Sequence, residues 1–261
     1  MFKCCSLYSG SSGNSFLIQS NHTKILVDAG VSCRKIETAL NNLDISPADI
    51  HAILITHEHI DHTKGLGILS SKYNIPIYAN EKTWGNINCN KILDENRKIF
   101  INNKKFDIED LTILPFSTPH DAADPCGFNI YKDTKKISIA TDLGNITKDV
   151  FDKLENSSLI MLESNYDMNI LKYSPYPYNL KRRIASAIGH LENCMAGKTI
   201  ARLADSGLKN AVLIHLSKEN NFPELAYKTV IEELEKNTIN KNNIKINVAP
   251  RDNPSAFIQV V

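Results

Sequence analysis

The stretch "ILITHEHIDH", residues 53–62, is an apolar run that ends abruptly in imidazole and carboxylate side chains. Its first half has the composition of a buried strand, and strand ends are where a rigid scaffold gives way to functional loops. His57 and His59 are two residues apart, so in an extended loop both imidazoles can project to the same side. Asp61 and His62 follow in a turn. This short segment can therefore serve two adjacent metal ions.

Histidine and carboxylate side chains also end the other apolar runs of the chain. The residues in question are Asp28, His57, His120, Asp142, Glu163 and His215. A scaffold that repeatedly delivers such side chains to strand ends builds one site. Of the eight histidines, only His22 and His51 fall outside strand ends and the motifs quoted below, and we expect both at the surface.

The composition is ordinary for a soluble globular enzyme: 42% of the 261 residues are hydrophobic, 23% are charged, and the formal net charge is +1. A polyanion would therefore have to bind to a local patch of cations. The longest apolar runs are too short to span a bilayer, and the start, "MFKCCSLYSG", lacks the apolar core of a signal peptide.

The cysteines bear on the cellular compartment. They are Cys4, Cys5, Cys33, Cys89, Cys126 and Cys194. They form no CxxC pair, and we expect them to be reduced and mostly buried, as small hydrophobic residues. This pattern indicates a cytoplasmic protein.

Short apolar or β-branched runs of strand length recur along the chain. The runs expected to form strands are residues 16–19, 24–30, 52–57, 75–80, 111–118, 127–132, 136–142, 159–164, 211–217, 244–249 and 256–261. The helical patterns are a segment capped by Ser32 that carries Ile36 and Leu40, residues 177–190 and 196–207, and residues 223–236 with a Glu232–Lys236 pair. Two groups of strands predict two sheets packed face to face with helices outside. We find no internal repeat or linker, so residues 1–261 are expected to form one domain.

Motifs along the whole chain resemble those of one enzyme family. "THEHIDH" looks like the signature of the metallo-β-lactamase fold. "SLYSGSSGNS", "TPHDAADPCGF", "ISIATDLGNIT", "YPYNLKRRIASAIGHLEN" and "HLSKENN" together resemble the YycJ/WalJ-type metallohydrolases of bacteria, from about residue 2 to the last strand. The resemblance implies an α/β (α+β) fold, a four-layer αββα sandwich of two mixed sheets with outer helices, and a dinuclear metal site at one edge.

The resemblance also implies a role for each histidine and carboxylate of the site. One ion would be held by His57, His59 and His120, and the other by Asp61, His62 and His215, with Asp142 bridging them. Imidazole and carboxylate ligands suit Zn²⁺ or Mn²⁺. Two such ions lower the pKa of a bridging water and clamp the oxygens of an in-line displacement. Asp28 is expected to brace the histidine loop.

Differences between branches of the superfamily reduce the number of reactions that this chain could catalyse. Flavin-dependent di-iron reductases have a Glu where this chain has His59, and the lactamases have a cysteine where it has Asp142. Glyoxalase-type thioesterases share that Asp, but "LES", "GHL" and "HLS" resemble segments of the tRNA-processing phosphodiesterases of the fold. Too few residues separate Asp142 from His215 for the inserted domain of the RNA exonuclease branch. A compact DNA-directed or small-substrate phosphodiesterase remains.

The family implies a 5′-to-3′ DNA exonuclease with a possible role in mismatch repair. We expect Asp61, Glu163 and His190 to be catalytic, the last two as a proton-donating pair. Substrate contacts are expected from Ser12, Asn14, Arg182 and Lys218. The cations at 181–183, 198, 202, 209 and 218 form either a basic strip at the mouth of the site or a solvated helix face.

Two other functions stay open at this point. One is a small-molecule metallohydrolase that acts on cyclic or small phosphodiesters or on thioesters. The other is a metal-bearing interaction module without turnover. The sequence leaves the oligomeric state and the identity of the metal open.

Overall fold

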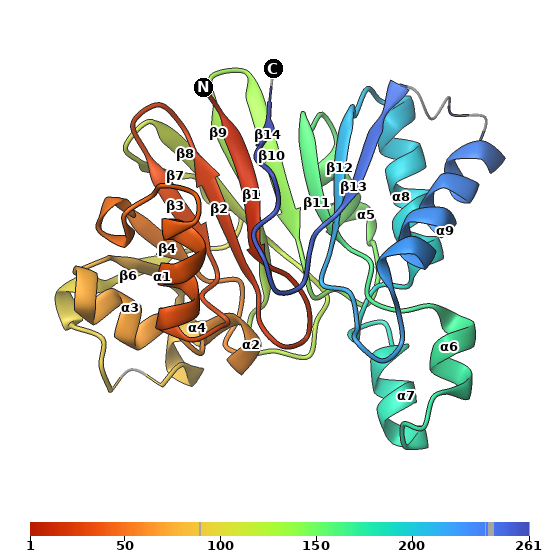
Figure 1. Ribbon diagram of the computed structural model, residues 1–261, viewed down its shortest axis with the longest axis horizontal. Coiled ribbons are helices and arrows are strands. Elements are labelled where there is room, and N and C mark those ends of the chain that lie inside the picture. The colour runs from red at the N-terminus through yellow and green to blue at the C-terminus, as the bar shows by residue number, and fades with distance from the viewer. Residues whose placement is uncertain (89, 238, 240–242, 261) are drawn as a thin grey trace.

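The computed structural model describes residues 1–88, 90–237, 239 and 243–260, which form two β-sheets between two layers of helices (Figure 1). Helices α1 (Cys33–Asn41) and α3 (Leu66–Tyr73) cover one sheet, and α8 (Asn193–Asp205) and α9 (Pro223–Lys236) cover the other. The predicted four-layer αββα sandwich is confirmed.

Within the described residues, each sheet has seven strands. The first has the order β14-β1-β2-β3-β4-β5-β6, with β1 at Lys3–Tyr8, β2 at Ser15–Gln19, β3 at Lys24–Val27, β4 at Ala52–Leu54, β5 at Ile77–Asn80, β6 at Arg97–Phe100 and β14 at Ile258–Gln259. The second has the order β13-β12-β11-β10-β9-β8-β7, with β7 at Phe106–Ile108, β8 at Leu111–Ser117, β9 at Cys126–Lys132, β10 at Lys135–Ala140, β11 at Leu159–Glu163, β12 at Asn210–Ile214 and β13 at Lys245–Val248.

The strand directions explain why polar residues gather at one edge. Strands β3 and β4 run parallel in the first sheet, and β10, β11 and β12 run parallel in the second. Parallel neighbours end at the same edge of a sheet, so the residues that follow them are brought side by side. These are the strand ends at which the sequence places histidine and carboxylate side chains.

Both faces of each sheet are buried, which explains the nearly continuous apolar runs. In β2, Phe16 and Ile18 pack into the core between the sheets, whereas Leu17 packs beneath the outer helices. In β12, Ile214 faces the central core and Leu213 faces the opposite helix layer. Successive side chains of a strand point to opposite faces, so a sheet covered on both faces needs apolar residues at consecutive positions.

The predicted helix over residues 177–190 is wrong in its second half. Helix α7 covers only Tyr178–Ile184, and the chain then folds back so that the His190 amide donates to the Ile184 carbonyl at 2.9 Å. Gly189 allows this fold, because a Cβ there would lie 2.2 Å from the same carbonyl oxygen. The fold-back returns His190 to the sheet edge.

Other expectations about elements meet mixed outcomes. The Ser32 hydroxyl caps α1 as predicted, accepting from the amide of Lys35 at 3.4 Å. Strands β1, β6 and β7 were not predicted. The Glu232–Lys236 pair is wrong, since Lys236 Nζ lies 2.6 Å from Glu233 Oε1 instead.

The remaining helices are short and lie near the loops. They are α2 (Ile60–Thr63), α4 (Glu81–Asn86), α5 (Lys148–Leu154), α6 (Met168–Tyr173) and the 3-10 turns η1 (Pro47–Asp49) and η2 (Asp94–Asn96). Helices α6 and α7 project below the body of the sandwich (Figure 1). Among the helices of the described residues, none has both the length and the apolar character that a membrane crossing requires.

The cysteines that the structure describes are free thiols. Cys4, Cys5, Cys33 and Cys126 are buried and Cys194 is half-buried, as the sequence predicts. Cys89 and Val261, the end of the last predicted strand, lie outside the described residues.

Candidate metal centre

The residues that follow the site strands share an unusual backbone conformation. Asp28, Asp142 and His215 have φ angles of 62°, 51° and 55°, in the left-handed region. This conformation costs a non-glycine residue roughly 1–2 kcal/mol, and such strain is concentrated at functional sites. At all three positions the chain turns sharply at the strand end and directs the side chain into the same space.

His57, His59 and His120 form one group of imidazoles. His57 Nε2 and His120 Nε2 lie 3.1 Å and 3.4 Å from His59 Nδ1. Burial lowers the pKa of His57 well below its usual value and also lowers that of His120. Neutral imidazoles offer a nitrogen lone pair to a cation. Nitrogens of the three rings lie within 4.8 Å of one another, close enough to hold one metal ion.

Asp142 lies between this group and a second one. Its Oδ2 is 3.0 Å from His62 Nε2 and 2.8 Å from His215 Nδ1, and its Oδ1 is 3.8 Å from His120 Nε2. Asp61 Oδ2 completes the second group, 3.6 Å from His62 Nε2 and 3.9 Å from His215 Nε2. Burial would raise the pKa of Asp142, but the adjacent histidines hold it well below its usual range. The structure thus brings all seven predicted ligands together.

The donor atoms of this site fit divalent cations. His215 Nε2 is buried and has no hydrogen-bond partner among the described residues. Leaving a buried polar atom unpaired costs about 1–3 kcal/mol, and a bound cation would remove that cost. Cys126 is the nearby thiol, and burial raises its pKa well above the usual value, so it does not offer a thiolate. Imidazole and carboxylate donors alone suit Zn²⁺ or Mn²⁺.

Buried polar groups hold the histidines in place from behind. Asp28 Oδ2 lies 2.7 Å from His62 Nδ1, and its Oδ1 accepts from the Thr56 amide at 2.9 Å. The Thr56 hydroxyl also lies 3.0 Å from His57 Nδ1. In the second sheet, the Thr141 hydroxyl donates to Asp142 Oδ2 at 2.7 Å. Contacts of this kind fix the ring orientation and the tautomer of metal-binding histidines.

Glu163 and His190 form a pair beside the metal groups. Glu163 is completely buried, and its Oε1 lies 2.7 Å from His190 Nδ1. Its Oε2 accepts from the amides of Leu143 and Leu191 at 2.9 and 3.2 Å. Burial lowers the pKa of His190, but the charge and hydrogen bond of Glu163 outweigh it and raise the pKa to about 9. The ring lies 5.3 Å from that of His120, centroid to centroid.

The residues predicted to contact substrate differ in exposure. Ser12, Arg182 and Lys218 are exposed. Asn14 is completely buried, exchanges hydrogen bonds with the backbone of Gly10 and lies 3.2 Å from His62 Nε2. The side chain of Asn14 therefore stabilises its own loop and does not face the solvent.

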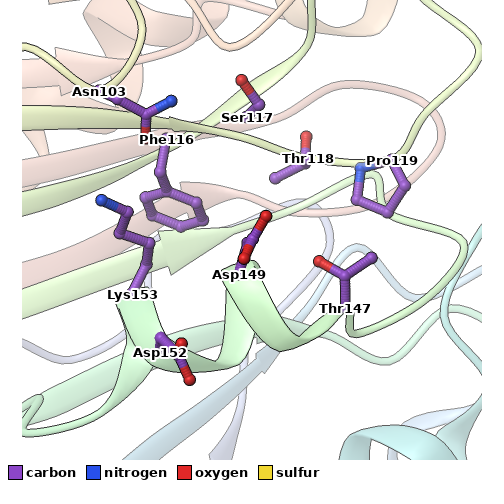
Figure 2. A pocket seen from close by; sticks show the side chains of 9 residues that line it. All are labelled: Asn103, Phe116, Ser117, Thr118, Pro119, Thr147, Asp149, Asp152 and Lys153. Carbon is purple, nitrogen blue, oxygen red and sulfur yellow. The ribbon is translucent and has the colours of Figure 1, made fainter.

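Two cavities differ in their relation to the site. One of about 580 Å³ lies between the end of β8 and α5, and its lining includes none of the predicted site residues (Figure 2). Its charged lining residues are Asp149, Asp152 and Lys153, an excess of negative charge that disfavours a phosphate. The other, of about 180 Å³, is lined in part by His190 and lies beneath α7.

Comparisons with known proteins agree with this geometry. The profile of the family described as "Beta-lactamase superfamily domain" matches residues 23–216. The chain is 41% identical over 237 residues to "Exodeoxyribonuclease WalJ" of Streptococcus pneumoniae, covering 89% of this chain and 88% of that protein. It is 36% identical over 231 residues to "Exodeoxyribonuclease YycJ" of Bacillus anthracis, covering 88% of each. The chain belongs to the WalJ/YycJ family of the β-lactamase superfamily.

Solved structures support the fold of this WalJ/YycJ-family chain. The metallo-β-lactamase fold protein YhfI of Bacillus subtilis aligns with a TM-score of 0.71 at 17% identity, covering 98% of this chain and 100% of that one. The short form of human tRNase Z aligns with a TM-score of 0.67 at 17% identity, covering 99% of both. At this identity the likeness shows the shared fold.

Three residues that contact the candidate metal centre were not predicted from the sequence. Thr56 and Thr141 bond to the histidine and aspartate beside them, and Asp121 Oδ1 lies 3.3 Å from His120 Nε2. Asp121 also forms an ion pair with Arg183 of α7. Each of the three is adjacent in sequence to a predicted ligand, and that adjacency is the signal that could have revealed them.

Proposed function

We propose that this protein is a dinuclear metal-dependent phosphodiesterase that degrades DNA as a 5′-to-3′ exonuclease. The observation that carries the proposal is the convergence of seven imidazole and carboxylate side chains in a chain that is 41% identical to a protein named as an exodeoxyribonuclease. Removal of DNA from a 5′ end would suit an excision step in mismatch repair. The cysteines that the structure describes are free thiols, which supports a cytoplasmic location.

The ligand assignment follows the two groups of donors. His57, His59 and His120 would hold one ion, Asp61, His62 and His215 the other, and Asp142 would contact both. Its carboxylate oxygens support this, because one faces His62 and His215 while the other faces His120. Bound Zn²⁺ or Mn²⁺ would lower the pKa of a water molecule and offset the charge of a phosphodiester.

Glu163 and His190 would protonate the leaving sugar oxygen. Glu163 keeps His190 Nδ1 engaged at 2.7 Å, so the other ring nitrogen is available to face the substrate. The side chain of His190 is 23% exposed, which gives it access to solvent and to a bound strand. A positioned acid contributes about 10²–10⁴-fold when the leaving group is a poor one, as an alkoxide is.

Cations on the surface would hold the polymer. Arg182 and Lys218 are exposed, on α7 and on the loop after β12. Ser12 is exposed at the tip of the loop before β2. Lys198 and Arg202 of α8 are exposed as well, and the guanidinium of Arg202 lies 3.8 Å from the ring centroid of Phe151. The exposed cations of the expected basic strip therefore lie on α7, on α8 and on the loop at 218.

The decisive experiment compares substrates for protein reconstituted with Zn²⁺ or Mn²⁺. Single- and double-stranded DNA carrying a 5′ or a 3′ label would be tested beside bis-nitrophenyl phosphate, a cyclic nucleotide and a thioester. We expect the 5′ label to leave first as a mononucleotide while the 3′ label stays in shortening strands. Early release of the 3′ label would refute the polarity, and thioester turnover with intact DNA would refute the proposal as a whole.

A further inference from the structure

Helices α6 and α7 and the turn between them form a segment of unusual composition, which we call the α6–α7 hairpin (residues 168–184). It contains Lys172, Lys181, Arg182 and Arg183 and no carboxylate, in a chain whose net charge is only +1. The hairpin also contains three of the nine tyrosines. It projects from the sandwich below β11 and β12 (Figure 1). Such a mixture of cations and aromatic rings is typical of surfaces that bind single-stranded nucleic acid.

The tyrosines of the hairpin face the solvent. Tyr173 and Tyr178 are 79% and 72% exposed, the highest values among the large hydrophobic residues that the structure describes. Lys172 Nζ lies 5.3 Å from the ring centroid of Tyr173, and the guanidinium of Arg182 lies 5.8 Å from that of Tyr178. Each exposed ring is thus paired with a cation, the two elements needed to hold a base and its phosphate.

The hairpin is fixed to the body, so the exposed rings are not simply on a loose loop. Leu171 is buried, and the amide of Asp167, the residue that caps α6, donates to the carbonyl of Asn220 at 2.9 Å. At the other end, Arg183 forms an ion pair with Asp121. His120 Nδ1 lies 2.9 Å from the carbonyl of Gly189, in the fold-back that follows α7. The α6–α7 hairpin and the metal centre therefore belong to one packed unit.

The cavity beneath α7 connects the hairpin with the proton-donating pair. Its lining residues include Tyr176 and Arg183 from the hairpin, His190, and Ser11 and Ser217 from the loops opposite. Its volume of about 180 Å³ is below the roughly 300 Å³ at which ligand pockets usually begin, so we expect it to receive only part of a nucleotide. A strand whose end enters this cavity must therefore keep its next bases outside, on the side where the hairpin lies.

We propose that the α6–α7 hairpin binds single-stranded DNA next to the cleaved end, with bases stacked on Tyr173 and Tyr178 and phosphates held by Lys172 and Arg182. This inference rests on the proposed exonuclease function. Every base has a π face, so stacking holds a strand without regard to sequence, as a nuclease that degrades DNA of any sequence requires. The absence of carboxylates in the hairpin sequence favours a polyanion over a protein partner of mixed charge.

The test uses two double variants of the metal-loaded full chain, Y173A/Y178A and Y173F/Y178F. Phenylalanine keeps the aromatic face and removes only the hydroxyl, so it is the matched control. Fluorescence anisotropy with a labelled single-stranded oligonucleotide measures binding, and kcat/KM on the same strand measures cleavage. We expect the alanine variant to lose roughly 5- to 150-fold in affinity per stacked base, with the phenylalanine variant close to the wild type.

A second strand with abasic sites at the nucleotides next to the 5′ end makes the test specific for stacking. The wild type should bind it as weakly as the alanine variant does, and the alanine variant should lose nothing further on it. Hydrolysis of bis-nitrophenyl phosphate should be unchanged in both variants, which excludes a folding defect. Equal binding of the normal strand by the alanine variant and the wild type would overturn the inference. The inference would also fail if the alanine substitutions weakened binding of the abasic strand by the same factor as binding of the normal strand. If wild-type protein binds the strand in this way but does not degrade it, the exonuclease proposal fails, whereas the inference that the α6–α7 hairpin binds single-stranded DNA is supported.

Discussion

Replacing His190 by alanine separates proton donation from metal binding. In DNA the leaving group is a sugar alkoxide, which needs a proton as the bond breaks, whereas a nitrophenolate leaves without one. The substitution should therefore slow DNA cleavage by about 10²–10⁴-fold, the usual contribution of a positioned acid. Turnover of bis-nitrophenyl phosphate should be largely kept, because all seven proposed ligands remain.

The structure also predicts the effect of this change on stability. Glu163 Oε1 loses its partner at 2.7 Å, while Oε2 keeps the amides of Leu143 and Leu191. A buried acceptor left unpaired costs about 1–3 kcal/mol, which lowers the Tm of a chain of this size by roughly 2–4 °C per kcal/mol. His190→Asn places an amide donor near the position of Nδ1 without an acidic proton, so it should recover part of the Tm but not the cleavage of DNA.

The assay measures kcat/KM on both substrates for the wild type and the two variants, with metal content determined by mass spectrometry. Thermal unfolding is recorded in parallel. If DNA and bis-nitrophenyl phosphate slow by the same factor while both ions are retained, His190 is not the acid. A variant that loses an ion would instead show that His190 is a ligand, since Asp142, Glu163, His190 and His215 also lie close enough to hold a metal.

Three further variants test other parts of the site. Asp142→Asn should lower metal content, measured by mass spectrometry, and remove nearly all turnover; two tightly bound ions with most of the activity would show that Asp142 is not shared. Asp28→Asn should weaken metal affinity by about 10–100-fold in a chelator competition, because His62 loses the carboxylate that orients it at 2.7 Å; an unchanged affinity would remove Asp28 from the site. Neutralising Arg182 and Lys218 together should reduce the salt dependence of single-stranded DNA binding, with a logarithmic slope that is shallower by about 0.7 for each phosphate that these cations no longer neutralise. Hydrolysis of bis-nitrophenyl phosphate should stay the same, and an equal loss on both substrates would point to misfolding.

The proximity of the proposed ligands could be predicted because these residues follow strands. A buried apolar run is visible in a sequence, and the first polar residues after it lie at the edge of the sheet, as His57, Asp142 and His215 do. The contacts that hold these side chains in place were harder to predict from the sequence. Thr56 and Thr141 are common strand-end residues, and their role depends on hydroxyl positions within 3.0 Å of imidazole nitrogens from the same or another strand end. Spacing along one chain does not determine such distances.

The errors in the fold have local physical causes. Residues 185–188 suit a helix by composition, but the helix ends at Ile184 because Gly189 must approach its carbonyl closely. Strand β6 lies at an edge of its sheet, and its residues Arg97, Lys98 and Ile99 are exposed, so it lacks an alternating pattern. Strand β7 has only three residues, Phe106–Ile108, too few to show a period.

The most direct test of the central claim is the rate of DNA degradation measured against the number of ions bound per chain. Metal-free protein would be titrated with Mn²⁺ or Zn²⁺, with bound metal and release of the 5′ label followed in the same samples. We predict that the rate rises with the second ion and reaches its maximum at two ions per chain. Full activity at one ion or none, or intact DNA when two ions are bound, would contradict the assignment of this site to a dinuclear exonuclease.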